Sequence, residues 1–183
     1  MATTTNVTAG KPKVVGAISV APLNTTLPTD ATTALDAAFV NLGYVSDDGL
    51  TNGSSRTVND IKAWGGDTVL SIQDEKTDTF STVFIEALNV DVLKMFYGDD
   101  NVSGTLATGI TVNVNSKELE THSWAIDMIM RDGALKRIVI PAGKITETED
   151  ITYSDTEVVG YSVTITAYPD ANGNTHYEYI KAS

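Results

Sequence analysis

Residues 79–100, TFSTVFIEALNVDVLKMFYGDD, change from the pattern of a β-strand to that of a short helix and then stop on glycine. In the first half, Phe80, Thr82 and Phe84 would lie on one side of an extended chain, while Val83 and Ile85 lie on the other. Apolar groups on both sides predict a strand that is covered on both faces.

The second half of this stretch predicts a helix of only about 12 Å, which is too short to be stable alone in water. Asn89 can cap its start by accepting a hydrogen bond from an early backbone N–H, and Gly98 can take the left-handed conformation that ends a helix. Apolar residues recur at helical spacing here. We therefore expect Leu93, Phe96 and Tyr97 to pack against a sheet.

The rest of the chain has β character. Alternation and turn residues predict strands at 14–21, 39–46, 67–74, 77–88, 110–115, 123–130, 135–140, 144–152, 158–168 and 175–180. We expect hairpin turns at 75–76, 131–134 and 169–174, and we expect Pro141 to end its strand. The predicted fold class is all-β, mainly an antiparallel β-sandwich or partly open barrel, with one short flanking α-helix.

The chain of 183 residues is of single-domain size, and we expect that domain at 14–183. Residues 1–13 are small and polar, which predicts a flexible N-terminal arm, mobile or ordered only against a neighbouring subunit. Residues 47–66 contain four glycines and no sustained period, which predicts a long loop, with a strand at 56–62 as the alternative. Loops of this length in compact domains usually carry function.

Trp64 is unusual because it stands beside two glycines in this predicted loop. A large aromatic residue in such a place either fills the edge of the core or anchors a contact with another chain. Both interpretations remain open from the sequence.

Composition excludes several classes of site. Without cysteine there is no disulfide, thiolate metal site or cysteine nucleophile. The net charge of −12, from 24 acidic and 12 basic side chains, argues against binding nucleic acid by neutralising phosphates. Residues 1–13 lack the basic start and apolar run of a signal peptide, and no stretch approaches the roughly 20 apolar residues of a membrane span. We expect no membrane partner.

The inventory for catalysis is small. His122 and His176 are expected to be ordinary histidines, because neither stands in a recognisable ligand or base motif. The pairs Asp47-Asp48 and Asp99-Asp100 lack the alternating ligand spacing of a calcium loop. We predict no catalytic, cofactor-binding or metal site, and no enzyme.

A series of short motifs runs through most of the chain from about residue 44: YVSDDGLT (44–51), DIKAWGGDTV (60–69), FIEALN (84–89) with LKMFYGDDNV (93–102), KRIVIPAGKITE (136–147) and VGYSVTITAYPDANGNTHYEYI (159–180). In this order the motifs resemble the major tail, or tail tube, proteins of long-tailed bacteriophages. AWGGD, then FYGDDNV, then AYPD before a Tyr-rich strand carry most of the resemblance.

The resemblance implies a structural subunit of the virion tail, assembled in the host bacterial cytoplasm, whose hexameric rings stack into a hollow tube. It implies assembly around a tape-measure protein, with tail terminator and initiator proteins as further partners, and DNA passing through without specific binding. It implies no cofactor. On this basis we expect inter-subunit or inter-ring contacts at Asp47, Asp48, Arg56, Asp60 and Trp64.

Three alternatives compete with this interpretation. One is the tube protein of a related contractile injection or type VI secretion system, to which the family is similar. Another is a carbohydrate- or receptor-binding β-sandwich on a virion surface, which would need a platform of exposed aromatic residues. The third, a β-fold hydrolase, would need clustered carboxylates or a histidine pair in a cleft.

Overall fold

A computed structural model describes residues 4–13 and 16–182. Its elements are η1 (Thr4–Asn6), β1 (Gly10–Pro12), β2 (Ile18–Pro22), β3 (Val40–Asn41), β4 (Val45–Lys62), β5 (Thr68–Phe84), α1 (Val90–Tyr97), η2 (Asp99–Asn101), β6 (Val102–Thr105), β7 (Gly109–Val112), β8 (His122–Met130), β9 (Leu135–Thr148), β10 (Tyr161–Tyr168) and β11 (Tyr177–Lys181).

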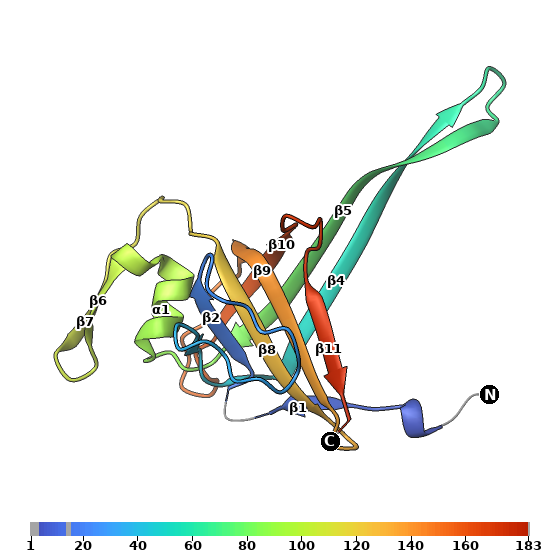
Figure 1. Ribbon diagram of the computed structural model, residues 1–183. Coiled ribbons are helices and arrows are strands. Elements are labelled where there is room, and N and C mark those ends of the chain that lie inside the picture. Colours follow the sequence, from blue (N-terminus) through green and yellow to red (C-terminus); the bar gives the residue numbers. More distant parts are fainter. Residues whose placement is uncertain (1–3, 14–15, 183) are drawn as a thin grey trace.

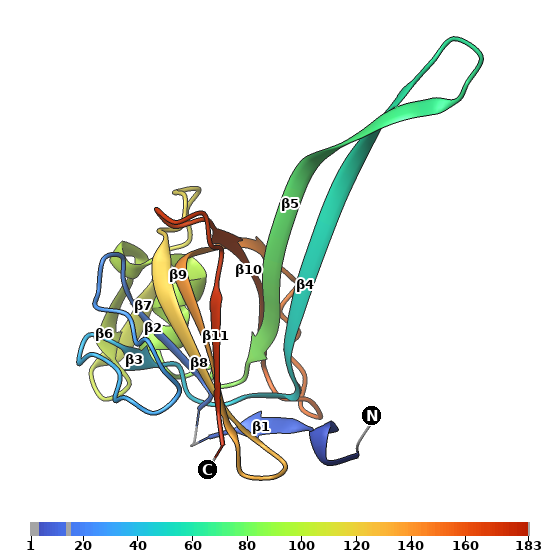
Figure 2. The same cartoon turned by 45° about the vertical axis from the view of Figure 1, so that its right-hand side comes forward.

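Within the described residues, nine strands form one antiparallel sheet in the order β3-β2-β8-β9-β10-β5-β4, with β1 paired to β8 and β11 paired to β9. Strands β6 and β7 form a separate hairpin. The sheet is curled, α1 and the β6–β7 hairpin lie to one side of it, and the β4–β5 hairpin extends away from the body (Figures 1 and 2). The expected fold class, all-β with one short flanking helix, is confirmed.

The core lies between the sheet and α1. Trp124 of β8 is buried at its centre and donates its indole N–H to the Gly143 carbonyl of β9 at 3.0 Å, so its polar atom is satisfied in an apolar setting. The core cluster includes Ile18, Phe80, Phe84, Val92, Trp124, Ile126, Ile140 and Ile165.

The long loop predicted at 47–66 is wrong, because most of it belongs to β4, and the alternative of a strand at 56–62 is confirmed. The hairpin turn predicted at 75–76 is also wrong, because pairing continues through it: Thr57 lies opposite Glu75 and Arg56 opposite Lys76. Both errors have one cause. Hydrophobic alternation marks a strand that buries one face, and here both faces are exposed.

The last predicted hairpin is also wrong. Strand β10 pairs with the second half of β9, and β11 pairs with the first half, so the two strands lie end to end along β9 and run in the same direction. Between them the chain makes a closed turn, in which the Asp170 N–H donates to the Asn174 carbonyl at 2.9 Å. Residues 169–174 therefore form a local turn, after which the chain continues in the direction of β10 instead of reversing.

Pro141 does not end its strand. The pairing of His122 with Gly143 and of Trp124 with Ile140 leaves two residues of β9 opposite Ser123 alone. This is a β-bulge, and the missing N–H of proline falls where ladder pairing is interrupted. The hairpin predicted at 131–134 is confirmed, with Gly133 at a φ of 85°.

Other boundaries move. The strand predicted at 39–46 is divided between β3 and the first two residues of β4. The one predicted at 14–21 begins at Ile18, with residues 14 and 15 outside the described chain. Part of the predicted N-terminal arm is fixed in place. Residues Gly10–Pro12 pair with Met130 to Met128, and the Lys13 N–H donates to the Asp127 carbonyl at 3.1 Å. Residues 1–3 lie outside the described residues.

Candidate functional site

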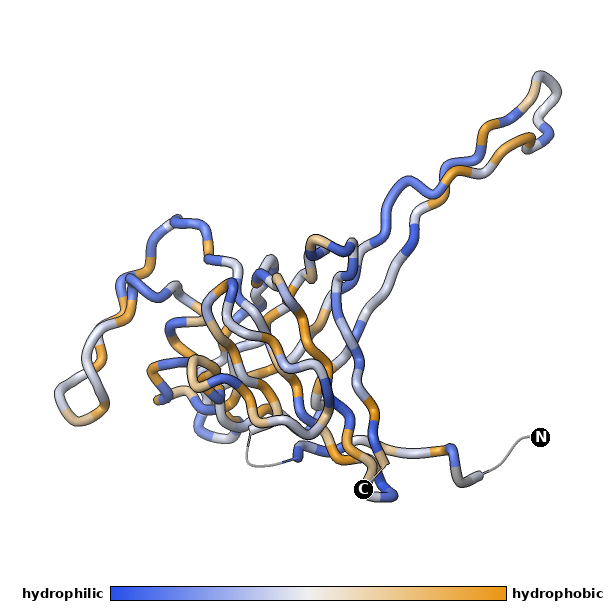
Figure 3. The backbone as a smooth tube through the Cα atoms, in the orientation of Figure 1, coloured by the Kyte–Doolittle hydropathy of each residue, from blue (hydrophilic) through white to orange (hydrophobic). Residues whose placement is uncertain are grey.

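The most prominent feature is the hairpin of β4 and β5. These strands have 18 and 17 residues, whereas strands in globular proteins usually have about 3–10. All residues from 54 to 76 are exposed or nearly so. About nine residues of each strand therefore project from the body, a reach of about 30 Å at ~3.3 Å per residue. Figure 3 shows hydrophobic residues along this projecting part.

One face of the projecting hairpin is apolar. Ile61 lies opposite Leu70, and Asn59 lies opposite Ile72, so these four side chains share a face. Leu70 is 52% exposed, and Ile61 and Ile72 are similarly open to solvent. We call the surface of Ile61, Leu70 and Ile72 the apolar face.

The other face of the hairpin is largely polar and its side chains bind one another. Arg56 donates to Gln73 Oε1 at 2.8 Å, and the Ser71 hydroxyl donates to the Asp60 carboxylate. Val58 is the apolar residue between them and is 55% exposed. Because these polar groups are already paired across the strands, this face offers fewer free hydrogen-bonding groups to a partner.

Trp64 stands at the tip of the hairpin. The Gly66 N–H donates to the Ala63 carbonyl at 3.0 Å and closes a four-residue turn, in which Gly65 has a φ of 120°, a conformation that favours glycine. The Trp64 side chain is fully exposed, at 108% of its reference area. The core-filling interpretation of Trp64 is therefore wrong, and its role as an interface anchor stays a prediction.

Asp78 fixes the root of the hairpin to the body. Its side chain is 1% exposed, and its Oδ2 lies 2.5 Å from Lys76 Nζ, accepts a hydrogen bond from the Thr175 hydroxyl and lies 3.8 Å from His176 Nδ1. Burial alone would raise the pKa of the Asp78 carboxyl, but the hydrogen bonds from Lys76 and Thr175 outweigh it and lower this pKa. The cluster joins β5 to the segment before β11.

Asp47 and Asp48 lie at the root, in a bulge. Val45 pairs with Phe84 and Leu50 with Thr82, so residues 46–49 have no partners in the ladder. Asp47 and Asp48 are exposed and line a groove. Apolar residues from three strands also line this groove, namely Leu50, Ile126, Met128, Met130 and Ile138.

The predicted contact residues are not brought together. Asp47 and Asp48 are at the root of the hairpin, Arg56 and Asp60 are on its polar face, and Trp64 is at its tip. Their contacts with other subunits stay predictions. Sequence reasoning missed the apolar face, because alternation at Leu70 and Ile72 predicts a strand that buries one side within its own chain, whereas both residues are exposed.

Helix α1 has the predicted N-cap, because Asn89 Oδ1 accepts from the Asp91 N–H at 3.0 Å. The helix ends at Gly98 as predicted, and the Gly98 N–H donates to the Lys94 carbonyl at 2.7 Å. The left-handed helical conformation expected at Gly98 is wrong, because its φ of 100° is combined with a ψ of 142°. Leu93 is buried.

The two aromatic residues of α1 are half-buried against β10. The ring centroids of Phe96 and Tyr161 are 4.9 Å apart, and those of Tyr97 and Tyr161 are 6.2 Å apart. Burial raises the pKa of both tyrosines above the ordinary range. The rings of Phe96, Tyr97 and Tyr161 thus pack together between α1 and β10.

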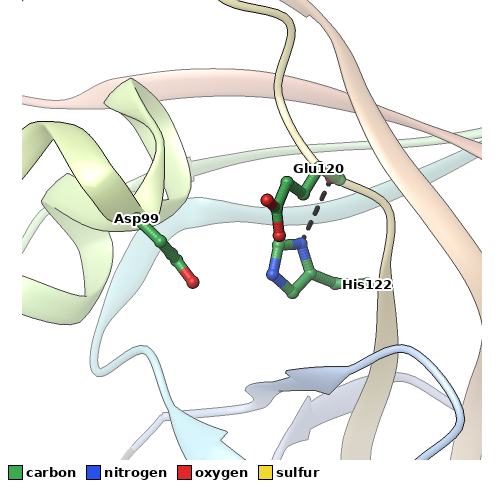
Figure 4. Close-up of side chains that lie close together, drawn as sticks. All are labelled: Asp99, Glu120 and His122. Atoms are coloured by element: carbon green, nitrogen blue, oxygen red, sulfur yellow. Dashed lines mark hydrogen bonds between the residues drawn. The ribbon is translucent and has the colours of Figure 1, made fainter.

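A second cluster lies where η2 approaches the start of β8. Asp99, Glu120 and His122 present carboxylate oxygens and an imidazole nitrogen that all lie within 4.8 Å of one another (Figure 4). Asp99 and Glu120 are exposed, whereas His122 is 9% exposed. The sequence pattern gave no indication of this cluster, because Asp99 stands more than twenty positions before the other two residues.

The structure is therefore that of a β-protein in which an antiparallel sheet carries a long projecting hairpin, with apolar side chains exposed on one of its faces. The sequence matches the family of phage tail tube proteins over residues 3–183, essentially its whole length. The chain belongs to that family. Comparison with curated proteins gives no match.

Membership assigns a structural role in the tube of a phage tail, which places the protein in the virion, and implies self-assembly into a tube. None of the described helices is long and apolar enough to cross a membrane.

Proposed function

We propose that this chain forms hexameric rings that stack into the hollow tube of the tail, and that DNA leaves the virion through the channel. The tube assembles in the host bacterial cytoplasm around a tape-measure protein, with initiator and terminator proteins at its ends. The observation that carries this proposal is the β4–β5 hairpin, which projects from the body and has an exposed apolar face.

The apolar face supports a contact with a second copy of the chain. Ile61, Leu70 and Ile72 stay exposed on the folded chain together with Trp64 at the tip. A contiguous apolar surface on a soluble protein usually marks an interaction site. In a tube built from identical subunits, the available partner is another subunit.

The edge of β4 supports lateral joining of subunits. Within the described chain β4 has only β5 as a partner and ends the strand order of the sheet, so one edge carries unpaired backbone groups. Such edges readily pair with another chain. Strand addition between neighbours would join the sheets of a ring into one continuous wall.

The positions of the tip and of the groove support stacking of the rings. The turn between β4 and β5, which carries Trp64, lies at one end of the molecule, and β1 lies near the other (Figure 1). Residues of β1 line the groove. A contact between two different surfaces is heterologous and continues indefinitely when rotation does not close it. We propose that the tip of one subunit docks in the groove of a subunit in the next ring, against the adaptable side chains of Met128 and Met130.

The charge supports passage of DNA without binding. A surface that neutralises phosphates binds DNA by releasing counterions, whereas this chain has 24 acidic and 12 basic side chains. A wall with this balance repels the polyanion. The receptor-binding alternative has less support, because Trp124, one of the two tryptophans, is buried in the core.

A shortened hairpin tests the proposal. Replacing residues 58–74 by Asn-Gly keeps Thr57 opposite Glu75 and supplies the residues that a two-residue β-turn favours. All the deleted residues are exposed, so the variant should keep the unfolding temperature of the parent chain.

The assay is electron microscopy of the purified chains at increasing concentration, with and without the tail initiator complex. The parent chain should form rings or tubes, and the shortened variant should form no tubes. Normal tubes from a folded variant would refute the role of the hairpin, and a parent chain that stays monomeric even with initiator would refute the proposed assembly.

A further inference from the structure

The cluster of Asp99, Glu120 and His122 has the chemistry of a cation site and plays no part in the proposed assembly. Asp99 begins η2 immediately after α1, Glu120 belongs to the segment that leads into β8, and His122 is the first residue of β8. Figure 4 shows the three side chains converging across the gap between these elements. Their ligand atoms lie within 4.8 Å of one another.

His122 is held as metal-binding histidines usually are. The residue is 9% exposed, and its Nδ1 lies 3.2 Å from the backbone carbonyl oxygen of Glu120. A proton on Nδ1 satisfies this carbonyl and leaves the lone pair on Nε2. Nε2 has no hydrogen-bond partner among the described residues and faces the carboxylates (Figure 4). A backbone carbonyl that fixes the tautomer and orientation in this way is the usual outer support of a metal ligand.

The two carboxylates are free to close on an ion. Neither Asp99 nor Glu120 has a side-chain hydrogen bond or ion pair within the described part of the chain. Bonds of about 2.0–2.1 Å to a tetrahedral zinc ion place its ligand atoms about 3.3 Å apart. The observed separation of up to 4.8 Å therefore requires rotation of exposed side chains only, while His122 stays where the fold holds it.

We propose that Asp99, Glu120 and His122 form a binding site for a divalent transition-metal ion, with Zn²⁺ as the preferred occupant. One imidazole nitrogen and two carboxylate oxygens suit zinc and its neighbours, whereas calcium takes six to eight oxygen ligands and magnesium near-ideal octahedral oxygen. Water completes the coordination. Lys94 also lines the cavity beside His122, and its positive charge limits the affinity.

The expected effect of the ion is structural. Residues 113–121 connect β7 to β8 without regular secondary structure, and this segment carries Glu120. An ion shared by Asp99 and Glu120 would fasten the segment to the end of α1, and thereby fasten the helix to the main sheet. Because the ion binds the folded chain, its binding should raise the unfolding temperature.

The test is titration of the tag-free chain with zinc chloride, followed by calorimetry and by thermal unfolding, with magnesium chloride as comparison. Cobalt(II) serves as a spectroscopic probe, because its visible absorption reports nitrogen and oxygen ligation. We expect one saturable zinc site per chain, an unfolding temperature that rises with zinc concentration, and no comparable response to magnesium.

Two variants decide whether these residues are the ligands. Asp99→Asn combined with Glu120→Gln changes exposed side chains, so the chain should fold while zinc binding weakens at least tenfold. Asp100→Asn is the matched control, because Asp100 is exposed and neighbours Asp99 but pairs with Lys117 at 3.8 Å. The absence of a saturable site, or equal binding by both variants, would overturn the proposal. Neither result depends on tube assembly.

Discussion

Replacement of Trp64 by alanine should weaken tube growth without changing the stability of the isolated chain. The Trp64 side chain is fully exposed, and a tryptophan that becomes buried removes about 150–250 Å² from water. At about 25 cal/mol per Å², this burial contributes about 4–6 kcal/mol before the costs of association. Truncation of an anchoring tryptophan typically costs at least about 2 kcal/mol, which corresponds to about a 30-fold weaker contact.

The measurement is the critical concentration for assembly, obtained by sedimentation of samples prepared at increasing concentration, and confirmed by electron microscopy. Trp64→Ala should raise the critical concentration about 30-fold or more. Its free energy of unfolding should change by less than about 0.5 kcal/mol, as is usual for a surface substitution. The unfolding measurement separates a lost contact from a lost fold.

A matched pair of substitutions tests whether the contact involves one face of the hairpin. Leu70 on the apolar face is 52% exposed, and Val58 on the polar face is 55% exposed. Leu70→Ser should raise the critical concentration, whereas Val58→Ser should leave it near that of the parent chain. If Trp64→Ala and Leu70→Ser both assemble at the parent concentration, the hairpin is not the stacking element and the reasoning from its exposed apolar residues fails.

Three further predictions concern the fold. Leu93→Ala should lower the free energy of unfolding by about 2–4 kcal/mol, measured by chemical denaturation, because it removes a buried side chain between α1 and the sheet. Asn89→Ala should lower it by about 1 kcal/mol, because it removes the cap on the Asp91 N–H; no change would show that the cap is dispensable. The pKa of Asp78 is lower in the folded chain than in the unfolded chain, so its contribution to stability is present above about pH 5 and decreases as the pH falls through 4. In Asp78→Asn, unfolding measured between pH 5 and pH 3 should depend less on pH, and an unchanged dependence would contradict this assignment.

Local signals sufficed to predict the helix. Asn89 and Gly98 mark its ends, and Leu93 and Phe96 recur on one side. Each of these signals acts within a few residues of the chain, where side chains compete directly for the backbone. The same holds for the turn at 131–134, where Gly133 takes a positive φ.

Long-range pairing was not predictable in the same way. Strand β9 accepts β10 along one half and β11 along the other. The intervening residues 169–174 have turn chemistry in either topology, because Asp170 and Gly173 favour a local turn and leave the direction of the chain beyond it open. The cluster around His122 is a similar case. Its members become neighbours only when η2 is placed beside β8.

The projecting hairpin presents a different difficulty. Ser54, Ser55 and Asn59 give β4 no apolar alternation, because neither face of this segment meets the core of its own chain. Strand β5 does show alternation at Leu70 and Ile72, and these residues form an apolar face that is exposed on the isolated chain. Hydrophobic alternation indicates that one side of a strand is buried, but it does not indicate whether the same chain or another chain buries it. In β5 the pattern fits burial by a neighbouring subunit.

The contacts at the root of the projecting hairpin hold the hairpin in a fixed direction. A hairpin that projects about 30 Å, at ~3.3 Å per residue, turns a small rotation at its base into a large displacement at its tip. Asp78 restrains that base through Lys76 and Thr175, and His176 packs edge-on against Phe80 with ring centroids 5.2 Å apart. A buried carboxylate with several partners is costly to displace. The contacts of Asp78 thus fix the direction in which the hairpin and Trp64 at its tip point. A chain that lacks the Asp78 carboxylate should fold yet assemble poorly.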